Sequence, residues 1–162
     1  MLQAINQPNS QTPICLAETT ITAIMLAKNI ISVVEKKLLN AYGLKTLAKG
    51  EENYVEVYEG DGKKRDSSYH QGITWPWLLG LYYNALKNIL KKTKKKDAKK
   101  ELETKLEKFI EKTSKTFQKE ISHNGCIGSI SELYDSRKPY LPKGTIAQAW
   151  SVAEVFRIIL NK

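Results

Sequence analysis

The sequence predicts an all-α fold of about four helices, with long loops that gather at one end of a helical layer. Two observations lead to this prediction. Apolar residues recur every three or four positions in separate segments, which is the period of one helix face. The segments are joined alternately by short and long connections, and alternate connections return to the same end of a helical layer. The long loops are therefore expected to meet there.

The N-terminal third begins with residues 1–19, which are polar and contain two prolines, so an irregular arm is expected. A helix is predicted over residues 22–40, and Gly43 follows it as a candidate left-handed cap. The apolar face of this helix consists of Ile24, Ala27, Ile31, Val34, Leu38 and Leu39.

A long polar loop is predicted over residues 44–68, with a turn at Gly60-Asp-Gly62. Loops of this length in a compact domain are more often functional than idle, although a flexible connector remains the alternative. The next helix is predicted over residues 74–90, where Thr74 is a candidate cap and Pro76 suits the first turn. Its buried side consists of Leu78, Leu79, Tyr82, Leu86, Ile89 and Leu90.

The C-terminal half contains two more predicted helices. A Lys-rich turn at 91–96 leads to a long helix over residues 96–121, which His123-Asn-Gly125 ends. Its narrow apolar stripe consists of Leu102, Leu106, Phe109, Ile110, Phe117 and Ile121, and Glu–Lys pairs cover the other face. A proline-containing loop over residues 136–146 precedes the last helix, 146–160, in which Trp150 is expected in the core.

The composition allows one domain of ordinary size, because 162 residues with 41% hydrophobic side chains can form a core. Much of the net charge of +9 comes from lysines between Lys91 and Lys119. Because these lysines lie on a helix with a clear apolar stripe, a solvated face is the expected explanation. Nucleic-acid binding is the alternative, and it would weaken steeply with salt.

Several functional classes are not expected. Cys15 and Cys126 make no disulfide framework, and His70 and His123 have no companion ligands at suitable spacing, so no metal or cofactor is predicted. The N-terminus lacks the pattern of a signal peptide, and no apolar run approaches about 18 residues. A cytoplasmic protein without a membrane segment is therefore expected.

The candidate catalytic residue is Glu132, in the stretch Gly125–Asp135. Glycines allow turn conformations there, and we expect a loop with a short extended piece that presents Glu132 beside Tyr134. A carboxylate on a fixed loop beside an aromatic ring suits a sugar-cleaving site. A surface glutamate in a loop is the alternative.

A second candidate stretch concentrates aromatic and polar side chains just before and within the start of the helix at 74–90. Trp75 and Trp77 can stack on the apolar faces of sugar rings. Tyr69, His70 and Gln71 are groups that can bind sugar hydroxyls. Core packing is the alternative for each Trp, above all for Trp77, and a structural role is the alternative for His70.

Together these stretches resemble the C-terminal part of the bacterial and archaeal glycogen debranching enzymes of the amylo-α-1,6-glucosidase type. The resemblance covers roughly residues 28–160, and its motifs occur in the family's order and approximate spacing. The matching segments are Tyr42–Leu47, Tyr69–Gly72, Trp75–Gly80, Gly128–Asp135 and Ala147–Glu154.

The resemblance implies a partial (α/α)6 toroid, with residues 20–162 as an incomplete C-terminal portion of the glucosidase domain. It implies inverting hydrolysis of α-1,6-linked glucose at the branch points of glycogen or limit dextrin. In inverting enzymes one carboxyl group protonates the leaving oxygen and a second activates water. By motif position Glu132 is the general base. Asp61, Asp66 and Asp135 do not match the family's acid motif, so the acid is expected outside this chain.

Other expectations complete the site. Tyr134 can hydrogen-bond near Glu132 or simply pack, and Gln148 is expected to orient Glu132. We expect little hydrolysis from this chain alone, and the missing N-terminal portion as a separate chain is a candidate partner. The alternative function is a non-catalytic carbohydrate-binding or assembly subunit that needs a partner chain.

Overall fold

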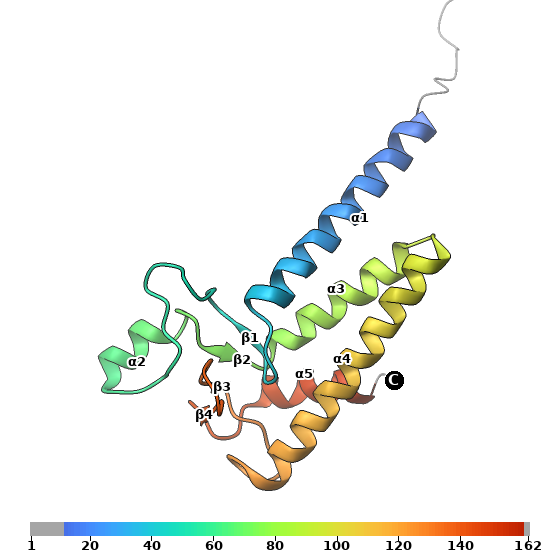
Figure 1. Ribbon diagram of the computed structural model, residues 1–162. Helices are drawn as coiled ribbons and strands as arrows, with labels where there is room; N and C mark the ends of the chain where they lie inside the picture. The colour runs from blue at the N-terminus through green and yellow to red at the C-terminus, as the bar shows by residue number, and fades with distance from the viewer. Residues whose placement is uncertain (1–11, 161–162) are drawn as a thin grey trace, which may run out of the picture.

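The computed structural model describes residues 12–160 of the chain. This part contains five helices and four very short strands, joined by loops. Figure 1 shows the strands and α2 together at one end of the helices. The mainly helical prediction is confirmed, but the sheet was not predicted. The elements are α1 (Thr12–Lys37), β1 (Leu44–Lys45), α2 (Gly62–Ser68), β2 (Thr74–Trp75), α3 (Leu78–Lys92), α4 (Lys96–His123), β3 (Leu133–Tyr134), β4 (Pro142–Lys143) and α5 (Ala149–Leu160).

Helix α1 begins earlier than the sequence predicted. It starts at Thr12, so residues 12–19 of the expected irregular arm are helical, while residues 1–11 lie outside the described part. Pro13 does not prevent this, because the first turn of a helix needs no backbone N–H donors. The end of α1 packs against α3 through Ile31 and Val34.

The turn after α1 differs from the predicted glycine cap. The helix ends at Lys37, and Asn40 Oδ1 accepts the backbone N–H groups of Tyr42 and Gly43 at 2.9 and 3.2 Å. Gly43 has no positive φ. A Cβ atom there would lie 2.3 Å from the carbonyl oxygen of Trp75, so close backbone approach is what requires glycine.

The predicted loop over 44–68 contains two elements of structure. Asp61 caps α2 by accepting the N–H of Lys64 at 2.8 Å, so the Gly60-Asp-Gly62 turn is also a helix start. Strand β1 pairs with β2, which pairs with β3, which pairs with β4, all antiparallel. Two-residue strands are too short to produce a period of two in the sequence, which explains why they were missed.

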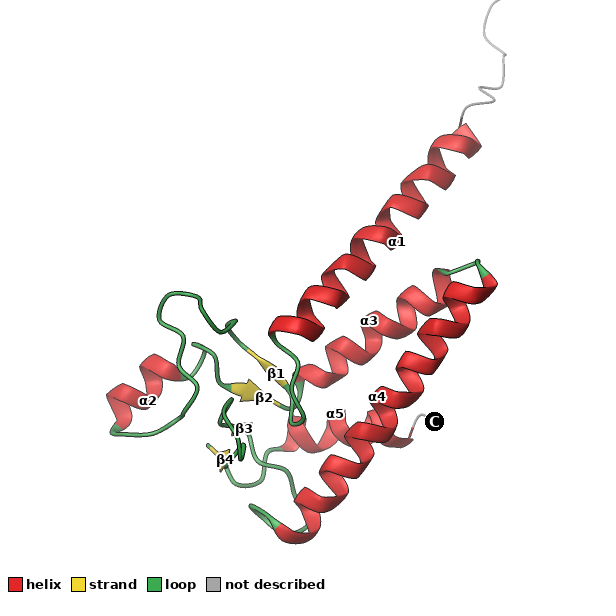
Figure 2. Cartoon of the chain, in the orientation of Figure 1, coloured by secondary structure: helices red, strands yellow, loops and turns green. Residues whose placement is uncertain are grey.

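Helix α3 begins later than predicted. Thr74 does not cap it but lies in β2, fully buried, with its hydroxyl 2.7 Å from Asn40 Nδ2 and 2.6 Å from Ser136 Oγ. The helix starts at Leu78, after a turn through Pro76 and Trp77. Figure 2 shows the short strands next to the first turn of α3.

The helical core lies between α3, α4 and α5. Helix α4 matches its predicted range closely, and α5 begins three residues later than predicted, at Ala149. The main core cluster consists of Leu79, Tyr83, Ile110, Phe117, Ile130, Tyr134, Val155 and Ile158. Because Ile130 and Tyr134 belong to it, the segment that holds Glu132 is fixed at both sides.

None of the helices between residues 12 and 160 combines the length and the apolar character that crossing a bilayer requires.

Candidate functional site

Glu132 lies just before β3, and donors from three separate segments hold its carboxylate. Oε1 accepts the hydroxyl of Tyr69 and, at 3.5 Å, the side-chain amide of Gln148. Oε2 accepts the backbone N–H of Thr145 at 2.9 Å. The side chain is only 8% exposed, so these bonds replace most of its hydration. Gln148, which was predicted to orient Glu132, thus lies beside its carboxylate, and its role stays a prediction.

A glycine allows the opposite loop to approach this carboxylate. Gly144 has φ of +68°, and a Cβ atom there would lie 2.4 Å from Glu132 Oε2. The following residue, Thr145, is the one that donates to Oε2. Loop 144–145 therefore contributes to the site through its backbone. Sequence reasoning missed this contribution, because it predicted only a proline-containing loop over residues 136–146.

Glu132 opens onto a cleft of about 910 Å³. The cleft is strongly polar, and its walls come from the segment around α2, from Glu132 and from the β4 loop. Its lining residues are Tyr58, Glu59, Arg65, Asp66, Tyr69, Glu132, Lys143, Gly144 and Thr145. A polar, open cleft suits a hydroxyl-rich ligand more than an apolar one.

Tyr69 is the side chain that connects the two predicted motifs. Burial, and then the hydrogen bond to Glu132 and the charge of that carboxylate, raise the pKa of the Tyr69 phenol well above its usual value of about 10. The phenol therefore stays protonated and remains a donor across the physiological pH range. Tyr69 also lies 5.8 Å from Tyr58, measured between ring centroids, on the same cleft.

Trp75 packs against Tyr69 and is buried. Its side chain is 3% exposed, and its indole N–H donates to the carbonyl oxygen of Tyr69 at 3.2 Å. The exposed His70 ring stacks on it, with centroids 5.5 Å apart and an interplanar angle of 13°. The prediction that Trp75 is a sugar platform needs an exposed ring face, and this packing covers it. Trp75 positions Tyr69 and His70 instead.

The half-buried Trp77 pairs with the exposed Trp150. Their rings stack with centroids 5.7 Å apart at 29°, and Trp150 is 48% exposed. The expectation of a core role for Trp150 is therefore wrong. It lies on the first turn of α5, beyond Trp75, whose ring it contacts edge to face at 6.2 Å. Aromatic rings thus continue from Tyr69 to Trp150.

Two other predicted residues lie in different surroundings. Tyr134 is fully buried, and its hydroxyl donates to Glu120 at 2.9 Å on the core side of β3. It has no surface to offer a sugar, which corrects its place among the predicted binding residues. Gln71 is half-buried, and its backbone oxygen accepts the N–H of Val55 at 2.6 Å, which holds the irregular segment before Tyr58 in place.

The three aspartates considered from the sequence as nearby acids lie in different surroundings. Asp61 caps α2, and Asp135 is buried, accepting the backbone N–H of Tyr58 at 2.9 Å. Asp66 is exposed and lines the same cleft as Glu132. Glu59 lines this cleft as well and was not singled out from the sequence, because nothing in its neighbourhood distinguishes it from other surface glutamates.

A glutamate held in a polar cleft, with exposed aromatic rings nearby, is an arrangement typical of glycoside hydrolases. The amylo-alpha-1,6-glucosidase family matches residues 4–157 of this sequence. The chain belongs to that family, and the predicted resemblance is confirmed. A comparison with curated proteins finds no match.

Proposed function

We propose that this chain is the base-bearing C-terminal portion of a glycogen-debranching α-1,6-glucosidase. Glu132 is the general base, and it activates water for inverting attack on the anomeric carbon of an α-1,6-linked glucose. The observation that carries the proposal is the position of Glu132: a nearly buried carboxylate, held on both oxygens, that lines an open polar cleft.

The donors around Glu132 support this role. A base needs its carboxylate held in a fixed orientation, and hydrogen bonds to both of its oxygens provide this. Tyr69 and Thr145 hold the two oxygens from opposite walls of the cleft. Cleft side chains such as Arg65 and Lys143 supply further donors for sugar hydroxyls.

The general acid is proposed to come from outside this chain, and the (α/α)6 toroid to be completed by the same missing portion. Inversion requires a second carboxyl group roughly 6.5–9.5 Å from the base. Asp66 is the acid inside the chain that deserves a direct test, because it is the one aspartate among Asp61, Asp66 and Asp135 that lines the cleft. It lies on α2, next to Arg65.

The test is glucose release from phosphorylase-limit dextrin, together with calorimetric binding of a branched maltooligosaccharide. The proteins are the natural chain, Glu132→Gln and Asp66→Asn. We expect the natural chain to bind the branched sugar more tightly than linear maltotriose while releasing little glucose. Absence of binding to either sugar would refute the proposal. Release that both substitutions abolish would instead identify Asp66 as an internal acid.

A second candidate is a non-catalytic carbohydrate-binding subunit, and the Trp77–Trp150 stack, in which Trp150 is 48% exposed, favours it. Such a protein would bind glucan through these rings without using Glu132. Binding that survives Glu132→Gln unchanged but is lost in Trp150→Ala would support this candidate over the enzyme portion.

A further inference from the structure

Asp135 is a buried carboxylate that lies just after β3 and has no part in the proposed reaction. Its side chain is only 6% exposed, and Oδ1 accepts the backbone N–H of Tyr58 at 2.9 Å. An uncharged asparagine could accept this hydrogen bond equally well. Burying a charged carboxylate costs free energy unless a cation lies close to it. The presence of aspartate at this position therefore points to a cationic partner.

Lys143 is that partner. Its Nζ lies 3.9 Å from Asp135 Oδ2, and no other cation between residues 12 and 160 lies within 4 Å of this carboxylate. Lys143 pairs with Leu133 in the β3–β4 ladder, so Asp135, two residues further, is its diagonal neighbour and within reach of a long side chain. A distance of 3.9 Å is too long for a hydrogen bond. The carboxylate thus attracts the ammonium group without using its three N–H donors.

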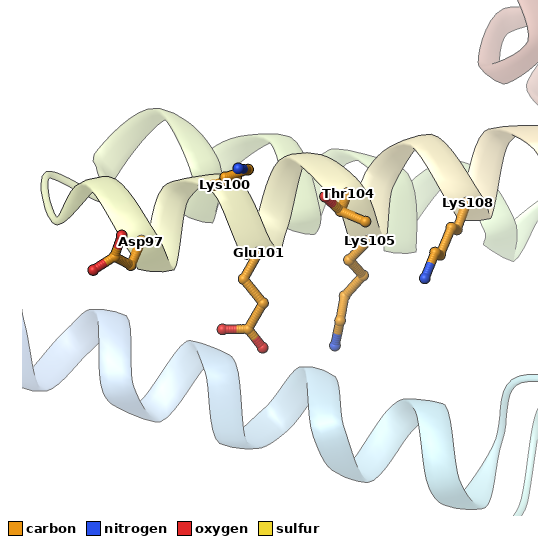
Figure 3. Close-up of a pocket in the computed structure, with 6 residues that line it drawn as sticks. All are labelled: Asp97, Lys100, Glu101, Thr104, Lys105 and Lys108. Atoms are coloured by element: carbon orange, nitrogen blue, oxygen red, sulfur yellow. The ribbon is translucent and has the colours of Figure 1, made fainter.

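A second ion pair in the chain shows the contrast. Lys105 Nζ lies 3.0 Å from Glu35 Oε2 and donates a hydrogen bond to it. Figure 3 shows Lys105 reaching from α4 toward α1, beside a space of about 550 Å³. That lysine uses a donor to join two helices. Lys143 instead lines the open cleft next to Glu132, where its donors can meet a ligand.

Asp135 also connects two walls of this cleft. Tyr58 lines the cleft from the segment before α2, and Lys143 lines it from β4. The two oxygens of Asp135 reach these two residues separately. A change at this buried carboxylate is therefore expected to alter the position of a donor that faces the ligand.

We propose that Asp135 is a positioning residue: it holds the ammonium group of Lys143 in the cleft so that Lys143 donates hydrogen bonds to hydroxyl groups of a sugar bound beside Glu132. The identity of the ligand rests on the proposed function. The positioning rests on the pair of Asp135 and Lys143 alone.

The first test is calorimetric binding of a branched maltooligosaccharide to the full chain. Lys143→Met should weaken binding about tenfold, since a hydrogen bond from a charged donor is lost. Asp135→Asn should weaken it by a smaller factor. The double variant should bind like Lys143→Met, because Asp135 acts only through Lys143.

Lys105→Met is the matched control for these variants. Lys105 also belongs to an ion pair, and its side chain is 37% exposed, against 28% for Lys143. It should change Kd by less than about twofold. Urea unfolding checks that each variant is folded. Losses that add up in the double variant, or an unchanged Kd in Lys143→Met, overturn the proposal.

The second test needs no sugar. Limited acetylation with acetic anhydride, followed by mass spectrometry, compares the reaction rate of Lys143 with that of Lys105 in the same sample. Lys143 should react faster in Asp135→Asn than in the natural chain, because its amine is no longer held by a carboxylate. Equal rates in the two proteins overturn the positioning.

Acetylation of the natural chain with and without the branched sugar completes the experiment and requires no substitution. Saturating sugar should slow the reaction of Lys143 and leave that of Lys105 unchanged. A sugar that binds without protecting Lys143 overturns the proposal. If the natural chain binds no sugar, the proposed function fails, and the comparison with Asp135→Asn still shows whether Asp135 holds Lys143.

Discussion

The hydroxyl of Tyr69 donates a hydrogen bond to Oε1 of Glu132, which is 63 positions away in the sequence. This bond joins the two motifs that attracted attention in the sequence and places both on one cleft. It also makes the phenol of Tyr69 a reporter of the charge on Glu132, because that carboxylate contributes to the raised pKa of the phenol.

The first prediction concerns this pair. Glu132→Gln should lower the pKa of the Tyr69 phenol toward its usual value, because the substitution removes the negative charge while burial, the largest cause, remains. Alkaline difference absorbance of tyrosinate measures the change, and Tyr69→Phe identifies the transition that belongs to Tyr69. Glu59→Gln, in the same cleft, is the control and should leave the transition nearly unmoved. An unchanged titration in Glu132→Gln would contradict the bond.

The second prediction compares two glycines with positive φ. Gly144→Ala and Gly128→Ala each place a side chain in a left-handed conformation, which costs roughly 1–2 kcal/mol. A Cβ atom at Gly128 meets nothing within 4 Å, whereas at Gly144 it would collide with Glu132 Oε2. Gly144→Ala should therefore lower the free energy of unfolding, measured in urea, by about 1–3 kcal/mol more than Gly128→Ala does.

The same pair of variants can be followed by NMR. The amide resonance of Thr145, which donates to Glu132, should shift in Gly144→Ala and stay in place in Gly128→Ala. Equal stability of the two variants, with an unmoved Thr145 resonance, would show that the carboxylate is not where we describe it.

The third prediction tests the stacked pair of Trp77 and Trp150. Trp150→Ala removes one ring of the Trp77–Trp150 stack and should weaken binding to limit dextrin about three- to tenfold, since aromatic contacts contribute roughly 0.5–1.5 kcal/mol beyond their area. Phe156→Ala is the control, because Phe156 is an exposed aromatic residue on the same helix, 38% exposed. Affinity electrophoresis in glucan-containing gels measures both. Similar losses in the two variants would argue against a specific role for the pair.

The fourth prediction concerns stability at alkaline pH. Tyr82 donates to Glu35 and Tyr134 donates to Glu120, and burial together with these carboxylates raises the pKa of both phenols. In the unfolded chain the pKa of each phenol returns to its usual value of about 10. Above that pH the unfolded chain therefore binds fewer protons than the folded chain. The contribution of these two tyrosines to the free energy of unfolding is therefore fully present below about pH 10, and it is lost as the pH rises further.

Urea midpoints measured between about pH 8 and 11 check this dependence. Tyr82→Phe should start from a midpoint lower by the equivalent of about 1 kcal/mol, because one hydrogen bond is lost. It should then lose less stability than the natural chain above pH 10. If the urea midpoints of the natural chain and Tyr82→Phe fell in parallel as the pH rises, ionisation of Tyr82 would not contribute to the loss of stability.

The helices were predictable because their physics is local. Helix α4 was predicted over residues 96–121 and is observed over Lys96–His123, since its apolar stripe and its end at His123-Asn-Gly125 are both visible in the sequence. Glu132 could be selected as a carboxylate in a glycine-containing loop that matches a family motif. Gln148 was selected for the same reason, and its side-chain amide lies 3.5 Å from Glu132 Oε1.

The roles of the aromatic residues could not be predicted, because neighbouring residues in a short strand or turn point in different directions. Trp75 in β2 is covered, while Trp77, two residues later, lies beside the exposed Trp150. Tyr134, two residues after Glu132, faces the core and binds Glu120. Burial at these positions depends on segments far away in the sequence.

The sequence by itself determined the helical fold, the family and the candidate base, because helical periodicity and motif order are properties of the chain alone. Only the tertiary structure decided which groups hold Glu132. The Tyr69 hydroxyl, the Thr145 amide and the close approach of Gly144 come from three separate segments. The four two-residue strands bring these segments together, and each strand is stable only through pairing with its neighbours.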